Sequence, residues 1–248
     1  MLALSILPLA CFAEGPVTAQ ITGGVFQDFA PSPHHMQHVL APLLRRMGMI
    51  MELRIIRAGY VPQGSGVIAL TVHPARRGLQ PVCMTAQGAV RRIAGVAFAS
   101  HLQERQVSER MASTCEARLA AAGLTAAIER VEDTAAAHAG ASLAAWAETS
   151  TECVLGADRA GALRRSSEAI GRFVAATLLE DLSTGATVDR HTADQLILFA
   201  ALAQGLSHYR TPRHTEHIDS NLWLIEQFGA RGGLQHRDIV IEGIHLQR

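Results

Sequence analysis

Lysine is absent from this sequence, and all 22 lysine-or-arginine positions are arginine. The absence excludes the lysine nucleophile of the common ligases and capping enzymes, and also the lysine of a Walker-type phosphate loop. If the chain forms a covalent bond to a nucleotide, histidine, with 12 copies, is the natural nucleophile. An arginine-biased genome is the other explanation for the missing lysine.

The sequence also lacks net charge. Its 22 acidic residues balance its 22 arginines, and the isoelectric point is about 7.2. No global basic field therefore attracts nucleic acid. Any contact with a nucleic acid must come from a local cluster of basic side chains.

Cysteine is scarce, with copies at Cys11, Cys83, Cys115 and Cys153. None of them forms a CxxC pair, and the spacing suits neither a zinc site nor a disulfide framework. We expect buried thiols in a reducing compartment.

The first segment, residues 1–19, is apolar and contains Leu-Pro-Leu-Ala-Cys, which is similar to a lipoprotein cleavage site. A secretory signal begins with basic residues, however, and none precedes Arg45. The run is also too short to span a membrane. These observations favour a buried helix over a secreted, lipid-anchored protein.

The pattern of apolar and turn residues predicts alternating strands and helices. The chain of 248 residues is 48% hydrophobic, enough for a sizeable core in one large or two small domains. Strands are expected over residues 17–22, 51–57, 66–72, 89–99, 125–131, 143–155 and 238–246, and helices over 34–47, 103–122, 166–182 and 192–204. A tight connection over 59–66 should join two strands as a hairpin. The predicted fold class is α+β, with strands and helices in repeated two-layer units.

The densest polar chemistry lies in residues 188–228. After the helix over 192–204, a second helix is expected to begin near Asp219 or Ser220, either of which can cap it. The apolar residues of this second helix are expected to point inward; they are Leu222, Leu224, Ile225 and Phe228. In the simplest interpretation, the two helices are amphipathic core helices with a polar edge.

A chemical interpretation of the same stretch starts from its polar residues. Asp194 and Gln195 lie near the start of one helix, and His217 should lie just before the start of the next. Helix N-termini attract phosphate, because their N–H groups lack partners and the helix dipole is positive there. A histidine in such a place, with a carboxylate on the neighbouring helix, could serve nucleotide chemistry.

The order of these residues resembles the RNA 3′-terminal phosphate cyclase family. The matching positions are Asp189, His191, Ala193, Asp194, Gln195 and Leu196, followed by His217, Ser220, Asn221, Ile225, Glu226 and Phe228. The resemblance implies that His217 is the nucleophile. It would attack the α-phosphate of ATP, pass the adenylate to an RNA 3′-phosphate, and allow the neighbouring 2′-hydroxyl to close a 2′,3′-cyclic phosphate.

The resemblance also implies roles for residues around the nucleotide. Asp194 corresponds to a carboxylate at the metal and triphosphate, where Mg²⁺ or Mn²⁺ would neutralise the departing pyrophosphate, and His191 to a ring beside the nucleotide. Pro31 corresponds to a proline that packs on the adenine, and His35 to a ring one helical turn later. Gln195 belongs to the same nucleotide motif.

Supporting roles have simpler alternatives. Asn221 would orient the loop of the nucleophile or only cap a helix, and Arg213 and Arg210 would recognise phosphate or be solvated loop charges. Asp194 itself could serve only to complement a helix dipole.

The domain organisation follows from the same resemblance. Residues 1–82 and 184–248 would form a discontinuous cyclase core, with a small inserted α/β domain at 83–183. Family members carry a further N-terminal portion with a glycine-rich motif, so the sequence resembles a member that begins part-way through.

Two functions are therefore open. One is a catalytic cyclase that uses ATP and a divalent ion on an RNA 3′-phosphate end, and the other is a non-catalytic relative, such as a scaffold in RNA processing or ribosome assembly, or an inactive truncated product. We expect a cytoplasmic protein that does not bind membranes and that could form a homodimer.

Overall fold

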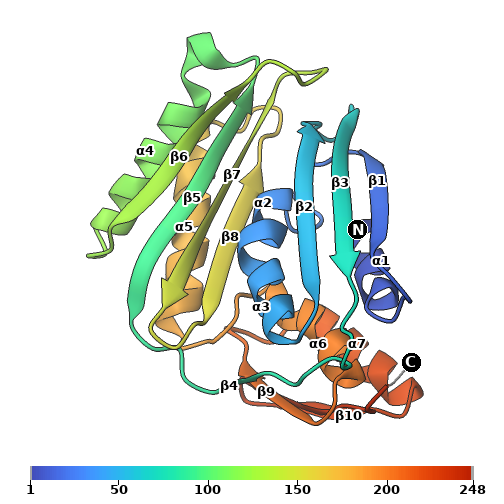
Figure 1. Ribbon diagram of the computed structural model, residues 1–248. Coiled ribbons are helices and arrows are strands. Elements are labelled where there is room, and N and C mark those ends of the chain that lie inside the picture. Colours follow the sequence, from blue (N-terminus) through green and yellow to red (C-terminus); the bar gives the residue numbers. More distant parts are fainter. Residues whose placement is uncertain (1, 247–248) are drawn as a thin grey trace.

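A computed structural model describes residues 2–246, and in them helices and three separate sheets form an α+β fold (Figure 1). One sheet lies in the N-terminal part, one in the middle of the chain and one at the C-terminal end. A single large cluster of buried side chains draws on all three parts. The predicted fold class is confirmed.

The N-terminal part pairs a three-stranded antiparallel sheet with two helical segments. The strands are β1 (Val17–Gly23), β2 (Ile50–Arg57) and β3 (Gly66–His73), in the order β1-β3-β2. The predicted hairpin between β2 and β3 is confirmed by their antiparallel pairing. The helices are α1 (Leu2–Ala10) and a continuous helical segment made of α2 (Pro33–His35), a π-helical turn (Met36–Leu40) and α3 (Ala41–Arg46).

The apolar N-terminal run does form a helix, α1, but only one face of it is buried. Ala3, Leu7 and Ala10 face the core, whereas Leu2 and Leu9 are exposed. Across the described residues, no helix combines the length and the apolar character needed to cross a bilayer.

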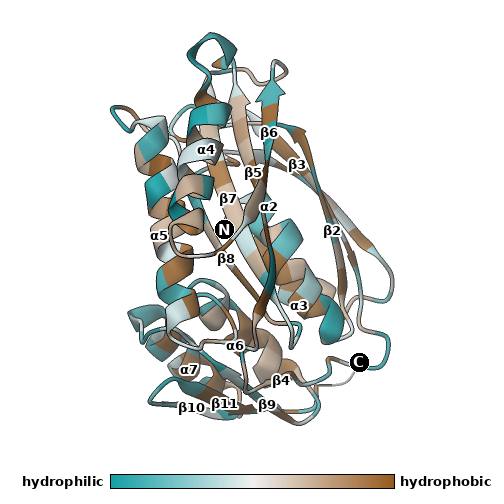
Figure 2. Cartoon of the chain, turned by 90° about the vertical axis from the view of Figure 1, so that its left-hand side faces the viewer, coloured by the Kyte–Doolittle hydropathy of each residue, from teal (hydrophilic) through white to brown (hydrophobic). Residues whose placement is uncertain are grey.

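The middle of the chain forms a four-stranded sheet with both of its helices on one face (Figure 1). Its strands are β5 (Val90–Ser100), β6 (Ala126–Asp133), β7 (Gly140–Thr149) and β8 (Val154–Ala160), in the order β6-β5-β7-β8, and its helices are α4 (Val107–Ala120) and α5 (Ser167–Ser183). The four-residue spacing of Val107, Met111, Cys115 and Leu119 predicts that they form one inward face of α4, and this prediction is confirmed because all four are buried. Figure 2 shows these strands as mostly pale or brown, as expected of a sheet covered by helices.

Two predictions for this part are wrong. The single strand expected over 143–155 is a hairpin, β7 and β8, which reverses at Glu152 with a φ of 63°. The helix expected from residue 103 is interrupted, because Gln103–Arg105 form a 3₁₀ turn and Gln106 takes a left-handed conformation.

The C-terminal part forms the third sheet, in the order β10-β11-β9-β4, covered by two helices. Its elements are β4 (Cys83–Met84), α6 (Thr192–Leu202), β9 (Leu206–Arg210), α7 (Glu216–Gln227), β10 (Arg231–Gln235) and β11 (Asp238–Glu242). Strands β9 and β10 were not expected from the sequence. The closing strand is present but ends at Glu242 rather than at residue 246.

The predicted cap of the second helix, Asp219 or Ser220, is wrong, because both residues lie inside α7, and its predicted inward face is wrong in part. Thr215 is the cap of α7, since its side-chain oxygen accepts the N–H of Ile218. Leu224 and Phe228 are exposed rather than buried.

Three of the four cysteines are buried free thiols, as expected, whereas Cys83 is exposed. Burial raises the pKa of Cys11 and of Cys115 to about 12.

Candidate active site

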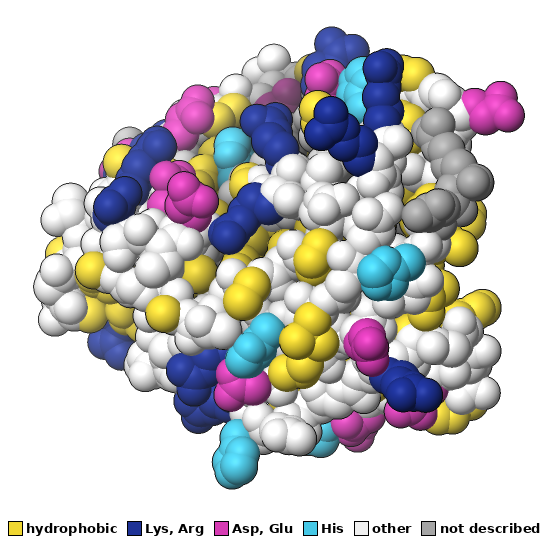
Figure 3. Space-filling view, turned by 60° about the horizontal axis from the view of Figure 1, so that its bottom comes forward, with side chains coloured by type: hydrophobic (Ala, Val, Ile, Leu, Met, Phe, Trp, Pro, Cys, Tyr) yellow, Lys and Arg dark blue, Asp and Glu magenta, His cyan; other side chains and the backbone are white. Residues whose placement is uncertain are grey.

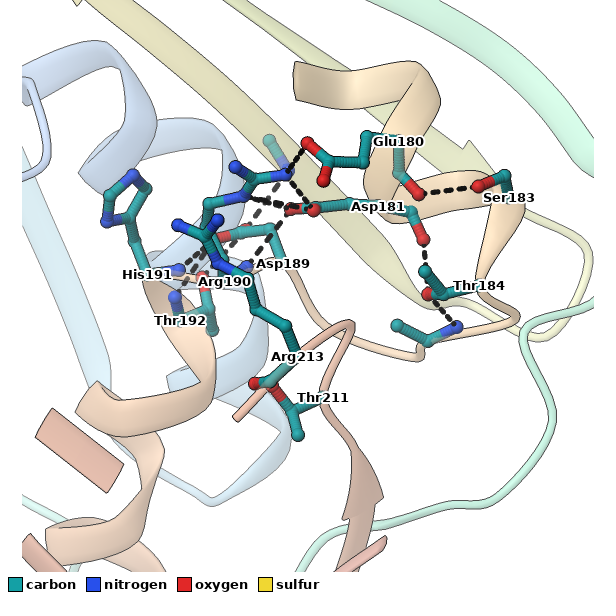
Figure 4. A network of polar contacts seen from close by, with 12 residues as sticks. Glu180, Asp181, Ser183, Thr184, Asp189, Arg190, His191, Thr192, Thr211 and Arg213 are labelled. Carbon is teal, nitrogen blue, oxygen red and sulfur yellow. Dashed lines mark hydrogen bonds and ion pairs between the residues drawn. The ribbon is translucent and has the colours of Figure 1, made fainter. Parts of the chain in front are cut away.

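The start of α6 is fixed by a buried aspartate just ahead of it. The Oδ1 atom of Asp189 accepts the backbone N–H groups of His191 and Thr192, each at 2.9 Å, and so satisfies free donors of the helix start (Figure 4). Its Oδ2 atom accepts the N–H of Gly156 in β8 at 3.0 Å and contacts Nε2 of His35 in α2 at 3.2 Å. One carboxylate thus joins three segments that are distant in sequence.

The buried pair of Asp189 and His35 is electrostatically coupled. Burial opposes the charge on His35, but attraction to Asp189 and the hydrogen bond with it outweigh that cost and raise the pKa of the imidazole. Burial likewise opposes the charge on Asp189, yet His35 and then His191 hold the pKa of this carboxyl well below its usual range. The pair is therefore most stable in its ionised form.

A second ionic cluster connects the start of α6 to α5. The guanidinium of Arg190 lies between Asp181 and Glu180, with Nε 3.0 Å from Oδ1 of Asp181 and a terminal nitrogen 2.6 Å from Oε2 of Glu180 (Figure 4). The hydrogen bond and charge of Arg190, and then the charge of Arg213, lower the pKa of Glu180. Sequence analysis missed Asp181 and Arg190 because neither belongs to the motif.

The first turn of α7 presents the predicted nucleophile. His217 is the second residue of the helix, not the residue before it, and its side chain is 83% exposed. Its Nδ1 atom lies 4.0 Å from Oδ2 of Asp194, whose side chain is 12% exposed. The two residues from neighbouring helices are therefore brought together, as expected.

Asp194 occupies a half-enclosed position between the helices. Burial raises the pKa of its carboxyl, although attraction to His217, the hydrogen bond from Gln195 and the charge of His191 act in the opposite direction. Asn221 of α7 donates through Nδ2 to the backbone oxygen of Asp194 at 3.1 Å. This bond holds the first turn of α6 against α7.

The remaining ring residues divide into an exposed one and a buried one. His191 is exposed, and its ring lies edge-on to that of His35 with the centroids 6.3 Å apart. His35 is only 2% exposed and bonds to Asp189, so it presents no open face to a base in this structure. Its position supports the start of α6 from behind.

Pro31 lies two residues before α2 and lines a shallow pocket of about 200 Å³. The pocket is mostly apolar and also includes Leu2, Gly24 and Met36. Arg213 is exposed on the loop before α7, and its backbone oxygen accepts the hydroxyl of Thr211 at 2.8 Å.

A metal ion would find few protein ligands here. Within residues 2–246, no three His, Cys, Asp or Glu side chains gather closely enough to hold an ion. Within the described residues, Asp194 is the one carboxylate recorded as an ion-pair partner of His217. This donor set fits Mg²⁺ or Mn²⁺ only where substrate phosphates and water supply the other ligands, which is how proteins usually bind Mg²⁺.

Sequence comparison covers this site and most of the fold. The profile of the family described as RNA 3′-terminal phosphate cyclase matches residues 1–232. The chain belongs to the RNA 3′-terminal phosphate cyclase family.

Individual relatives agree with the family match. A protein named RNA 3′-terminal phosphate cyclase from Methylococcus capsulatus is 35% identical over 226 residues, which are 91% of this chain and 62% of the relative. One of the same name from Hyperthermus butylicus is 36% identical over 90% of this chain and 63% of its own length. A third, from Korarchaeum cryptofilum, is 30% identical over 98% of this chain and 70% of the relative.

This cyclase-family chain thus spans less than two thirds of the first two relatives. Inside the matched region lie every predicted site residue and the buried cluster around Asp189. The structure groups His191, Asp194 and His217 at the starts of α6 and α7, with Asn221 and Gln195 beside them.

One feature of the sequence could have predicted that Asp189 caps the start of α6. Aspartate is a common capping residue, and the side chain of Asp189 accepts the N–H groups of His191, which stands at the N-cap position of α6, and of Thr192, its first residue. Its partner His35 lies 154 residues away, and no local pattern indicates that contact.

Proposed function

We propose that this chain carries the nucleotide-transfer centre of an RNA 3′-terminal phosphate cyclase, a ligase-class enzyme of the cytoplasm. The enzyme would use ATP to convert an RNA 3′-phosphate into a 2′,3′-cyclic phosphodiester. The observation that carries the proposal is the placement of the exposed His217 ring 4.0 Å from the half-enclosed carboxylate of Asp194.

The first step would be attack by His217 on the α-phosphorus of ATP. A nitrogen–phosphorus bond forms, the bond from that phosphorus to the bridging oxygen breaks, and pyrophosphate leaves. The ring must be unprotonated to attack. Because Nδ1 faces Asp194 and Nε2 has no hydrogen-bond partner among residues 2–246, Nε2 is the nitrogen we assign as nucleophile.

Two further steps would complete the reaction. An oxygen of the RNA 3′-phosphate attacks the adenylate phosphorus, which frees His217 and leaves AMP joined to the RNA end. The adjacent 2′-hydroxyl then attacks the 3′-phosphorus, loses its proton and expels AMP, closing the ring.

The other residues of the site would bind and orient. Asp194 would hold a divalent ion together with the phosphates of ATP, and that ion would supply neutralisation of the charge that develops on pyrophosphate. His191 offers an exposed ring to the nucleotide, while Asn221 keeps α6 and α7 in register. Arg213 is exposed on the loop leading to the nucleophile, where a phosphate would meet it.

The test is transfer of label from ATP to the protein without RNA. We expect the protein, incubated with ATP labelled on its α-phosphate and with Mg²⁺ or Mn²⁺, to take up acid-labile label, and His217→Ala to abolish it. His214→Ala is the matched control, because His214 is also exposed, lies three residues earlier and pairs with Asp219 instead. Wild-type protein that takes up no label would favour the alternative, a non-catalytic relative that binds RNA as a scaffold.

A further inference from the structure

We propose that a groove beside the end of β3 binds the phosphodiester backbone of single-stranded RNA a few nucleotides upstream of the reacting 3′-end. This inference rests on the proposed function, since it takes the RNA end to lie at His217. A chain with no net charge needs a local cluster of basic side chains to bind a polyanion such as RNA, and the groove provides such a cluster. Figure 3 shows that arginines stand in separate groups on the face it displays, rather than covering it evenly.

The groove has a volume of about 820 Å³ and lies between the end of α3 and the loop that follows β3. Its polar lining consists of Glu52, His73, Arg76, Arg77 and Gln80. Both arginines are exposed, and no carboxylate within residues 2–246 lies within ion-pairing distance of either. Since the groove's single carboxylate, Glu52, lies 3.9 Å from His73, both guanidinium groups remain free for an anion.

The loop that carries the two arginines is held in place from several sides. Ala75 donates its N–H to the backbone oxygen of Cys11 at 3.2 Å, and Gln80 donates its N–H to that of Met47 at 2.8 Å. The buried side chains of Ala75 and Leu79 flank the arginine pair in sequence. The cations are therefore presented on an ordered backbone, which lowers the entropy cost of binding.

The same loop is bonded to the far end of α6. Gln204 donates its N–H to the backbone oxygen of Leu79 at 2.8 Å and its side-chain amide to that of Arg77 at 3.0 Å. Asp194 lies ten residues before Gln204, a separation of roughly 15 Å along this segment at the helical rise, so the loop and the reacting centre lie at opposite ends of α6. A few nucleotides of extended RNA can cover that distance.

The partner is RNA backbone rather than a specific base sequence. Guanidinium groups bind phosphate strongly, and a pair of adjacent arginines matches successive phosphates of a strand. The lining of the groove includes no Phe, Tyr or Trp, and its one ring is the imidazole of His73, which lies 3.9 Å from Glu52. We therefore expect sequence-independent, salt-dependent binding.

The test compares the double variant Arg76→Ala/Arg77→Ala with a matched control, Arg118→Ala/Arg172→Ala. The control arginines are exposed on α4 and α5 and lack an ion-pair partner within the described part of the chain. Binding of a fluorescein-labelled, 3′-phosphorylated single-stranded RNA is measured by anisotropy over a salt series. We expect the groove variant to bind about tenfold more weakly, with the salt slope reduced by about 1.4 for two lost contacts, and the control to match wild type.

Two further measurements separate the groove from the catalytic centre. A 3′-phosphorylated dinucleotide is too short to reach the groove, so its KM should be unchanged in the groove variant, and ATP-dependent labelling without RNA should also be unchanged. Unaltered binding of the long RNA, an equal loss with the dinucleotide, or lost labelling would each overturn the proposal. Wild-type protein that binds RNA but takes up no label would overturn only the proposed function. The groove would still be tested by comparing the RNA affinity of the groove variant with that of the control variant.

Discussion

Asp189 and His35 form a buried ion pair, with Oδ2 of the aspartate 3.2 Å from Nε2 of the imidazole and side chains that are 0% and 2% exposed. The pair links α2 to the start of α6, and the same carboxylate also receives the N–H of Gly156 in β8. The candidate active site therefore depends on a charge that does not itself reach the surface.

Removing that charge should destabilise the protein strongly. In Asp189→Asn the imidazolium loses its counter-ion, and the amide cannot accept all of the hydrogen bonds that the carboxylate accepts. Breaking a buried pair in this way costs about 3–5 kcal/mol. Chemical denaturation gives the free energy of unfolding.

The control for this variant is Asp238→Asn. Asp238 also pairs with a histidine, His208, at 2.8 Å, but its side chain is 35% exposed. Solvent screens such a pair, so we expect a loss of about 1 kcal/mol or less. Equal losses in the two variants would show that the buried pair contributes no special stability.

The stabilising effect of His35 should depend on pH with a definite sign. Because the pKa of His35 is raised in the folded state, its contribution is fully present below the unfolded value of about 6.5. The contribution is lost as pH rises through the folded pKa. The difference in unfolding free energy between wild type and His35→Gln should therefore shrink as pH increases from about 6 upward. A constant difference across that range would mean that the ring is neutral when folded.

Some elements followed directly from the sequence because a repeated local pattern determined them. The four-residue spacing of Val107, Met111, Cys115 and Leu119 predicted the buried face of α4, and the structure confirms it. The β7–β8 hairpin was missed because its turn residues Ser150, Thr151 and Glu152 include no glycine, proline or asparagine to indicate a reversal.

The candidate site was predictable to the extent that it is local. His217 and Asp194 were found because each lies in a short motif near a helix start, and the structure places them 4.0 Å apart. The contact between Asp189 and His35 joins residues 154 apart, and it depends on how β8 and α2 pack against the start of α6. Spacing along the chain carries no information on such a contact.

Gly171 explains how closely the two helices of the middle sheet approach. A Cβ atom at this position in α5 would lie 2.5 Å from the backbone oxygen of Met111 and 2.9 Å from Cβ of Thr114, both in α4. We expect Gly171→Ala to lower the free energy of unfolding by about 1–3 kcal/mol through overpacking, although alanine is intrinsically the better helix former.

The matched control is Ala176→Gly at an exposed position of the same helix. It should cost about 1 kcal/mol, the ordinary helix-propensity difference. If Gly171→Ala stabilised the protein by that amount, the close approach of α4 and α5 would be disproved. Thermal or chemical unfolding of both variants measures the two changes in unfolding free energy.

The carboxylate of Asp194 should control the first chemical step without being the nucleophile. In Asp194→Asn the side chain keeps its size but loses the charge that we assign to holding a divalent ion at the phosphates, so the rate of label uptake from ATP should fall by about a hundredfold or more. Asp219→Asn on α7 makes the same chemical change at an exposed position where the carboxylate contacts His214, and its rate should remain close to wild type. The ion concentration that gives half-maximal labelling should also rise in Asp194→Asn and stay unchanged in Asp219→Asn. A normal labelling rate and ion dependence in Asp194→Asn would remove this residue from the reacting centre, because a carboxylate that only complemented the start of α6 would affect stability and leave the chemistry unchanged.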